Sequence, residues 1–435
     1  MTESLGRRLG RVVSSLRYTD LPFEVVSKAK SVMLHDLAVA FGGVTSDQTR
    51  IVLGMLPRLI NGETVIGQAF KSSTEAAAFA NSVMARALRM EDTIIPSFIH
   101  PGASLIPAAL AVAERERVDG QTVITALVAG YEVLGRIAGS LWSWEVANRT
   151  SHHLFGAFGV AAVAARLMRL DLDQTVGALA HAANLAATIT YGIQDVQYGI
   201  VTRNGLLAAE LGRVRAPFPE DFLEGPYGFY AVQLGGQRPS DEEILRVRQP
   251  TDIMTAVLKP HPCTALNLVP ISLAQRLIGA HDLAGDDITI IRVRRGRNVG
   301  RVPNIHSTGP FTGGAYSAIS SLPFALSVLV AEGAVLPRHF EATDDPKYGA
   351  GMRKVIIDSV DELNLLEHHI SIETRDGRRF NASGGAEVLS APDPRALLET
   401  HAQPVIGTEK INTLLREMSA LEWARDLTGV TECLA

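Results

Sequence analysis

Two long stretches of this sequence are rich in alanine and glycine and carry almost no charge, which restricts the folds open to the chain. Residues 120–141 read GQTVITALVAGYEVLGRIAGSL, and residues 156–170 read GAFGVAAVAARLMRL. Helices that are apolar on most faces must be buried against other helices. Small side chains also let helix backbones approach one another closely. These stretches therefore predict a tightly packed helical core, and they favour a homodimer that covers part of the apolar surface.

Helical periodicity continues through the rest of residues 1–255. It is clear near the amino terminus, where apolar side chains recur at Leu5, Leu9, Val13 and Leu16. Residues 391–435 become helical again and are expected to return to this domain. Because 435 residues exceed what one hydrophobic core usually supports, we expect a second domain between these two parts.

The pattern changes after about residue 255. Residues 288–295, ITIIRVRR, alternate like a half-buried strand, and HHISIETRDGRRFNA contains two strand-like runs around Asp376-Gly377, a typical hairpin turn. Helical patterns are expected at 266–280, 315–333 and 352–361. The predicted fold class is therefore mainly α, with a large helical domain and a smaller α+β domain. The domains are predicted at 1–255, joined by 391–435, and at 256–390.

Composition and motifs exclude several classes of function. The net charge is −5 without long charged blocks, so no nucleic-acid partner is expected. Cys263 and Cys433 are too few for a disulfide framework. The sequence contains no phosphate-binding loop, no G-x-S-x-G elbow and no H-E-x-x-H helix, so we expect neither a nucleotide cofactor nor a metal. Without an apolar leader or a membrane span, a cytoplasmic protein is expected.

Polar residues interrupt the apolar sequence at a few places that could carry chemistry. Each has a structural alternative: His100 precedes a proline and could satisfy a backbone group, and one of the adjacent His152 and His153 is expected to be structural. The other places are the acid pair of EDTIIPSFIHPGAS, the run YGIQDVQYG, and LKPHPC. We expect residues 91–104 to form a turn between helices, with Asp92 and His100 at the rim of an interdomain cleft.

Taken together, these residue types are the ones used to move a proton beside a carboxylate. Imidazole titrates near neutral pH and can act as base or acid without a large pKa shift. A lysine such as Lys259 can hold a carboxylate and stabilise the enolate-like charge that develops when a neighbouring C–H bond breaks. Such a site needs neither a metal nor a cofactor.

The order of several segments resembles the MmgE/PrpD family, which includes 2-methylcitrate dehydratase and cis-aconitate decarboxylase. EDTIIPSFIHPGASLIPAALAVAE is similar to the family's Asp-Asp-Thr…His-Pro segment, and LKPHPCTALN to its Lys-Pro-Tyr-Pro-Cys motif. FGAFGVAAVAARLMRLD and NGLLAAELGRVRAPFPEDFLEGPYGF resemble further landmarks, so the similarity covers most of the chain. The resemblance implies a homodimer with an active site between its domains and cofactor-free chemistry on small carboxylic acids.

The resemblance assigns site residues position by position. Asp92, Thr93, His100, Lys259 and Cys263 match the family's pattern. The sequence departs from that pattern at five other positions, which are Arg89, Thr150, Gln194, His261 and Phe324. We therefore expect a substrate other than 2-methylcitrate.

The predicted roles follow from these matches. The catalytic set is His100, His152, Lys259, Asp92 and His261, and the substrate-binding set is Arg89, Thr93, Gln194, Cys263 and Thr150. The predicted function is a dehydratase-like lyase or isomerase acting on a small organic acid. The alternatives are a decarboxylase or epimerase on the same scaffold, and a dimer that binds without catalysis. A metal site built from His152, His153, His100 and Asp92 is the third and least favoured interpretation.

Overall fold

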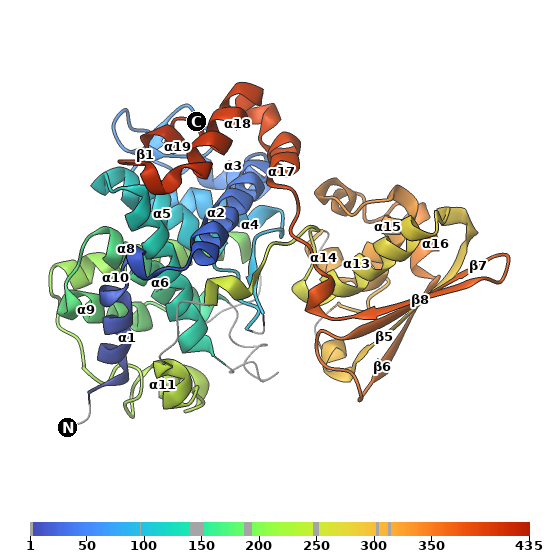
Figure 1. Ribbon diagram of the computed structural model, residues 1–435, viewed down its shortest axis with the longest axis horizontal. Helices are drawn as coiled ribbons and strands as arrows, with labels where there is room; N and C mark the ends of the chain where they lie inside the picture. Colours follow the sequence, from blue (N-terminus) through green and yellow to red (C-terminus); the bar gives the residue numbers. More distant parts are fainter. Residues whose placement is uncertain are drawn as a thin grey trace. The chain divides into compact units, whose positions relative to one another are not determined.

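The structure is a computed structural model that describes residues 3–95, 97–139, 152–186, 194–246, 252–301, 304–311 and 315–435. The chain forms two compact units (Figure 1). The first contains residues 1–258 and 393–435, and the second contains residues 259–392. The predicted divisions fall at residues 255 and 390. The predicted fold class is confirmed, because the first unit is helical and the second combines helices with a four-stranded sheet.

The first unit is built from helices joined by short connections. Its α-helices are α1 (Leu5–Ser15), α2 (Phe23–Gly43), α3 (Asp47–Leu53), α4 (Thr74–Ala87), α5 (Gly102–Glu116), α6 (Gly120–Ala138), α8 (His152–Leu167), α9 (Leu172–Asn184), α10 (Gln194–Arg213), α11 (Phe229–Leu234), α12 (Asp241–Leu245), α17 (Pro394–His401), α18 (Gln403–Ser419) and α19 (Thr428–Thr431). Its 3₁₀ turns are η1 (Tyr18–Asp20), η2 (Asp252–Thr255) and η7 (Leu421–Trp423). Two antiparallel pairs of very short strands complete it, namely β1 (Glu63–Thr64) with β2 (Lys71–Ser72), and β3 (Thr93–Ile94) with β4 (Ala256–Val257).

The alanine- and glycine-rich stretches form the centre of this unit. Helix α6 packs against α8, and α10 packs against α4, α8 and α9. Helices α6 and α8 can approach closely because glycine has no side chain. A Cβ added to Gly130 of α6 would lie 2.6 Å from Val163, and one added to Gly159 of α8 would lie 2.7 Å from Leu134. Among the described helices, none has the length and hydropathy needed to cross a membrane.

Helices from early and late in the sequence pack together in this unit. Helices α17 and α18, drawn in red in Figure 1, pack against α2, drawn in blue. Leu398 of α17 and Ile411 of α18 are fully buried there, so the carboxy-terminal residues contribute to the same core as the amino-terminal ones. Residues 393–435 thus belong to the same compact unit as residues 1–258.

The second unit is a four-stranded sheet with helices packed on it. The strand order is β6-β5-β7-β8, in which β5 and β6 are parallel and the other neighbours antiparallel. Helix α13 packs against β7 and β8, and α15 packs against α13, α16 and β6. The elements are α13 (Ala265–Ala280), η3 (Gly285–Asp287), β5 (Ile288–Gly296), η4 (Arg297–Arg301), α14 (Ala315–Ser320), α15 (Leu322–Glu332), η5 (Pro337–Glu341), α16 (Pro346–Met352), β6 (Val355–Val360), β7 (His368–Thr374), β8 (Arg379–Gly384) and η6 (Ala386–Val388).

Most of the predicted elements of this unit are confirmed, with one exception. Strand β5 covers the alternating run, and β7 and β8 form the hairpin around Asp376-Gly377, where Gly377 takes a φ of 85°. The helix predicted for residues 352–361 is wrong, because most of that segment is strand β6. Its β-branched residues Val355, Ile356 and Ile357 favour a strand, and their local spacing resembles a helical face over so short a run.

Candidate active site

The turn between α4 and α5 is folded into the core of the first unit. Its described residues are 88–95 and 97–101, and among them the apolar Ile94 and Ile99 are only 3% and 2% exposed. The N–H of Ile94 donates to the carbonyl oxygen of Ile99 at 2.8 Å. At the start of the turn, β3 pairs with β4, and Thr93 lies opposite Val257. The turn is therefore held by burial of its isoleucines and by a strand from much later in the chain.

Asp92 lies inside the protein, and the expectation that it sits at a rim is wrong. Its side chain is completely buried. Oδ1 accepts a hydrogen bond from the N–H of Gly102 at 2.7 Å, and Oδ2 accepts one from the Tyr131 hydroxyl at 2.7 Å. The N–H of Asp92 donates to Oδ1 of Asp36 at 3.1 Å. Desolvation raises the pKa of the Asp92 carboxyl to about 6 despite these hydrogen bonds, and the charge of Glu91 acts in the same direction.

Replacing Gly102 with alanine is expected to destabilise the first unit. A Cβ at this position would lie 2.0 Å from Oδ2 of Asp36 and 2.7 Å from Oδ1 of Asp92, and both carboxyl groups are buried. Overpacking of this kind costs about 1–3 kcal/mol. The matched control is Gly279→Ala in helix α13, where no atom lies within 4 Å of an added Cβ. Thermal unfolding should show a lower midpoint for Gly102→Ala only; equal midpoints would contradict the proposed packing.

Glu91 and Arg86 form a buried ion pair beside His100. Glu91 is fully buried, and its Oε1 pairs with Nη1 of Arg86. The same Oε1 lies 3.2 Å from Nδ1 of His100, and the carbonyl oxygen of Asp92 lies 3.2 Å from the same nitrogen. The His100 side chain is 16% exposed, whereas Glu91 is not exposed at all. His100 is therefore the most exposed of these three side chains, and its ring is held by the buried Glu91 carboxylate.

His152 lies in the interior of the same unit. Its Nε2 is 2.9 Å from the Ser104 hydroxyl, and its ring stacks on Tyr198 with centroids 4.5 Å apart and an interplanar angle of 3°. The guanidinium of Arg86 lies over the Tyr198 ring, 4.6 Å from its centroid. Burial raises the pKa of Tyr198, so its hydroxyl stays protonated. Through this stack, His152 is connected to the ion pair that contacts His100.

The other site residues predicted in the first unit are Arg89, Thr93, Gln194 and Thr150. Arg89 is buried and pairs with Asp195 of α10 at 2.5 Å, and burial raises the pKa of the Asp195 carboxyl. A substrate carboxylate would therefore have to share Arg89 with an existing partner. Thr93 is fully buried, and its hydroxyl has no hydrogen-bond partner among the described residues. Gln194 begins α10, and Thr150 lies outside the described residues.

Lys259, His261 and Cys263 belong to the second unit, in the segment that precedes α13. Their exposed fractions are 1%, 7% and 1%. The N–H of Cys263 donates to the carbonyl oxygen of His261 at 2.9 Å, which closes a tight turn around Pro262. Burial lowers the pKa of His261, and hydrogen bonds to Val335 and Gln275 offset part of that effect. Cys263 is a buried free thiol.

Several members of the cluster around His100 were not predicted. Asp36 lies in the apolar run VMLHDLAVAFGG of α2, where a charged residue inside a buried helix would have been a usable signal. Glu91 stands beside Asp92, but nothing in the sequence distinguishes it from a solvated surface acid. The others come from separate helices with ordinary local patterns; they are Arg86, Ser104, Tyr131 and Tyr198.

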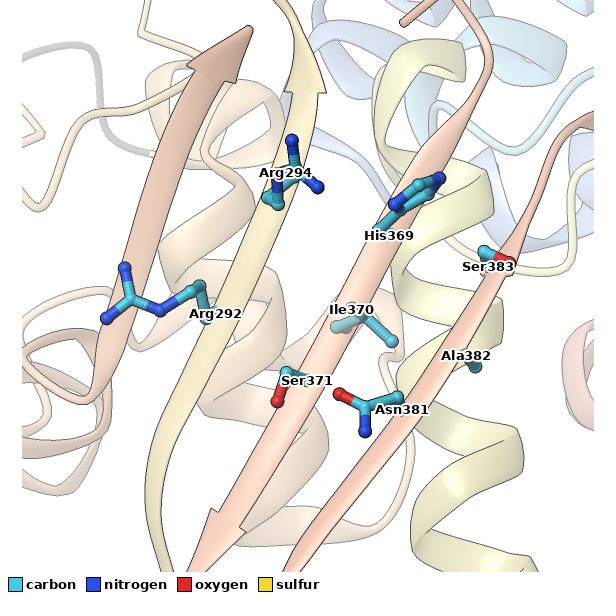
Figure 2. A pocket seen from close by; sticks show the side chains of 8 residues that line it. All are labelled: Arg292, Arg294, His369, Ile370, Ser371, Asn381, Ala382 and Ser383. Carbon is cyan, nitrogen blue, oxygen red and sulfur yellow. The ribbon is translucent and has the colours of Figure 1, made fainter.

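A shallow hollow of about 310 Å³ lies on the sheet of the second unit, over β5, β7 and β8. Figure 2 shows Arg292 and Arg294 on β5, with His369 of β7 beside Arg294. Both arginines already have acidic partners: Nη1 of Arg292 is 3.0 Å from Asp358, and Arg294 pairs with Glu362. Because these charges are compensated, the hollow is a weaker candidate for binding an acid than the cluster of the first unit.

The arrangement in the first unit suits proton transfer. The partly exposed imidazole of His100 contacts the buried carboxylate of Glu91. The buried carboxyl of the next residue, Asp92, has a pKa of about 6. Imidazole and carboxyl groups are the side chains most often used as general acids and bases. Within the described residues, no group of three or more histidine, cysteine or acidic side chains is arranged to hold a metal ion.

Comparison with known proteins gives a consistent set of similarities. The model of the MmgE/PrpD N-terminal domain matches residues 7–242. A cis-aconitate decarboxylase of Aspergillus terreus is 26% identical over 288 residues, which is 62% of this chain and 59% of that protein. A cis-aconitate decarboxylase-like protein of Aspergillus oryzae is 26% identical over 219 residues, or 46% of this chain and 45% of that protein. The matches thus span less than two thirds of these relatives.

Proposed function

The chain belongs to the MmgE/PrpD family, and we propose that it is a cofactor-independent lyase that removes a proton next to a carboxylate of a small organic acid. At the coarse level, the family and the relatives named cis-aconitate decarboxylase support a dehydratase- or decarboxylase-like lyase. The finer proposal is a dehydratase-like reaction on a substrate other than 2-methylcitrate. In it, a base takes the proton, the electron pair of the C–H bond forms an enolate, and the enolate expels a hydroxide from the neighbouring carbon.

The environment of His100 is the observation that carries this proposal. Its Nδ1 faces two oxygen acceptors, the Glu91 carboxylate and the Asp92 carbonyl group, both at 3.2 Å. An Nδ1 in that position carries the hydrogen, so the lone pair of the neutral ring is on Nε2. We therefore assign Nε2 of His100 as the atom that takes the proton. The carboxylate of Glu91 stabilises the imidazolium that forms.

Lys259 is proposed to hold the substrate carboxylate and to stabilise the enolate charge. This role rests on the resemblance of LKPHPC to the family's Lys-Pro-Tyr-Pro-Cys motif. An ammonium group beside the substrate can stabilise the negative charge that develops when the C–H bond breaks.

The other residues of the predicted site have supporting roles in the proposal. His152 holds Ser104 and Tyr198 in place, and Asp92 fixes the turn through Gly102. Arg89 and Thr93 are proposed to contact polar groups of the substrate, together with Gln194 and Thr150. His261 and Cys263 are proposed to shape the segment that carries Lys259, because they form its tight turn.

Solvent deuterium exchange tests the proposal directly. The protein is incubated in D₂O with a panel of hydroxy- and unsaturated di- and tricarboxylic acids, and deuterium at carbon is followed by NMR. We expect incorporation next to a carboxylate for one class of acid, followed by formation of the dehydrated product. His100→Ala should abolish incorporation because it removes the base. Lys259→Ala should reduce it strongly because the enolate loses its stabilising cation.

The control is His401→Ala, which removes a histidine of α17 that is not part of the cluster and should leave incorporation unchanged. Circular dichroism establishes that each variant is folded. If no acid of the panel exchanges, or if His100→Ala exchanges as fast as the wild type, the proposed reaction is wrong. Release of carbon dioxide instead of water would favour the decarboxylase alternative.

A further inference from the structure

The second unit contains a buried arginine that the proposed reaction does not use. Arg295 lies near the end of β5, on the face where Ile291 and Val293 are also buried, and its own side chain has no exposed surface. Its Nη2 donates to the carbonyl oxygen of Leu266 at 2.7 Å, and its Nη1 donates to Oδ1 of Asn267 at 3.2 Å. A guanidinium has five N–H donors, and these contacts use two of them.

One of these contacts has a structural explanation. Leu266 lies in the first turn of α13, and the residue four positions later is Pro270, which has no N–H to offer to the Leu266 carbonyl. Arg295 satisfies that carbonyl instead. A neutral donor would do the same without placing a charge in the interior, so this contact does not account for a guanidinium.

No acidic side chain pairs with Arg295 among the described residues. Its neighbours in sequence differ in this respect: Arg292, Arg294 and Arg297 each form an ion pair with an acid. Burial lowers the pKa of Arg295 to about 9, so the group is still a cation at neutral pH. The Nε of Arg295 is buried and has no hydrogen-bond partner among the described residues. A buried charge without a counter-ion is costly, and proteins normally pair it.

Two histidines lie near this charge and have buried nitrogens of their own. His368 is opposite Arg295 on β7, with Nδ1 2.9 Å from the Leu366 carbonyl oxygen. The Nε2 atoms of His368 and His306 both lack hydrogen-bond partners among the described residues. Burial, reinforced by the charge of Arg295, lowers the pKa of His306 to about 4 and that of His368 to about 3. The start of α13 adds positive potential at the same place.

We propose that Arg295, His306 and His368 form a binding site for a small oxyanion, such as a carboxylate or phosphate. The anion would accept hydrogen bonds from Nε of Arg295 and from the imidazole of His306, and it would supply the missing negative charge. His306 is half-buried, as is Ser307 next to it, so the anion would enter at this turn. The inference rests on the second unit alone and does not depend on the proposed reaction.

Titration of the full-length protein with simple anions tests the proposal. Isothermal calorimetry at pH 7 and constant ionic strength compares sodium acetate, succinate and phosphate with chloride. We expect saturable binding of an oxyanion to the wild type and at least about tenfold weaker binding to Arg295→Met, since a hydrogen bond to a charged group is typically worth that much. Arg297→Met is the matched control, because Arg297 is exposed and paired with Asp361, and it should bind like the wild type. The anion with the lower dissociation constant shows whether the site takes an organic acid or inorganic phosphate.

Two further measurements keep the test decisive if Arg295→Met folds poorly. His306→Ala changes a half-buried residue and should weaken oxyanion binding while the protein stays folded. The oxyanion that binds should raise the unfolding temperature of the wild type more than that of Arg295→Met, because only the wild type keeps the proposed site. Oxyanion binding that is absent, or equal in the wild type and all three variants, would overturn the site. So would an Arg295→Met protein that is less stable by the same amount in every salt, because the role would then be limited to the Leu266 carbonyl.

Discussion

Between pH 4 and pH 7, the free energy of unfolding of Asp92→Asn is expected to rise by about 3 kcal/mol relative to that of the wild type. This change corresponds to the rise of the Asp92 pKa from its ordinary 3.8 to about 6. A carboxyl whose pKa is raised by folding binds its proton more tightly in the folded state. Its contribution to stability is therefore complete below about pH 4 and is lost as the pH passes through 6. Asparagine does not ionise, so this loss is absent from the variant.

The amide can also keep the local geometry. Its oxygen can accept from the N–H of Gly102, as Oδ1 of Asp92 does, and its NH₂ group can donate to the Tyr131 hydroxyl oxygen. Urea unfolding at several pH values measures the effect. Tryptophan fluorescence reports on the first unit alone, because Trp142, Trp144 and Trp423 all lie in its residue ranges.

A second buried carboxyl provides the control for this experiment. Asp252 also has a pKa raised to about 6, by desolvation and by the nearby charge of Glu132, but it pairs with Arg246 and is not part of the His100 cluster. Asp252→Asn should therefore reproduce the change in pH dependence without affecting turnover. Stability curves of Asp92→Asn and wild type that run parallel from pH 4 to 7 would show that Asp92 is not perturbed.

The fold was predictable to the extent that its elements are encoded in local patterns. Helices α6 and α8 carry few charged residues and have clear helical periodicity, and the Asp376-Gly377 hairpin has a typical turn sequence. Residues 352–361 were assigned to the wrong class because a run of six strand residues is too short for its period to be decisive. The pairing of β3 with β4 could not be predicted, because its two-residue strands lie more than 160 residues apart and have no periodicity of their own.

The site was less predictable because burial of charge is a tertiary property. Arg89 was identified from the family pattern, but its partner Asp195 lies on another helix, and the ion pair changes what Arg89 can offer a substrate. Glu91 has the sequence context of a surface acid and becomes a buried partner of His100 only through the fold. Arg295 belongs to a run of basic residues whose sequence is typical of a solvated strand end. Side chains alternate between the two faces of β5, and this alternation places Arg295 on the buried face.

Breaking the ion pair between Arg86 and Glu91 is expected to destabilise the protein more than breaking an exposed pair does. Arg86→Met leaves the Glu91 carboxylate buried without its guanidinium, and breaking a buried pair in this way costs about 3–5 kcal/mol. Methionine keeps an apolar chain against the Tyr198 ring, so little of the loss should come from packing. The matched control Arg17→Met breaks the exposed pair with Asp20 and should cost much less, because solvent screens that pair.

A double-mutant cycle separates the charge effect from packing. Arg86→Met and Glu91→Leu should each be strongly destabilising, whereas the double variant should be more stable than the sum of the two losses predicts, by at least about 2 kcal/mol. The reason is that neither charge is then buried alone. Unfolding in urea followed by tryptophan fluorescence gives all four free energies. Additive losses would mean that the two side chains contribute independently, and the buried charge behind His100 would then be held by other groups.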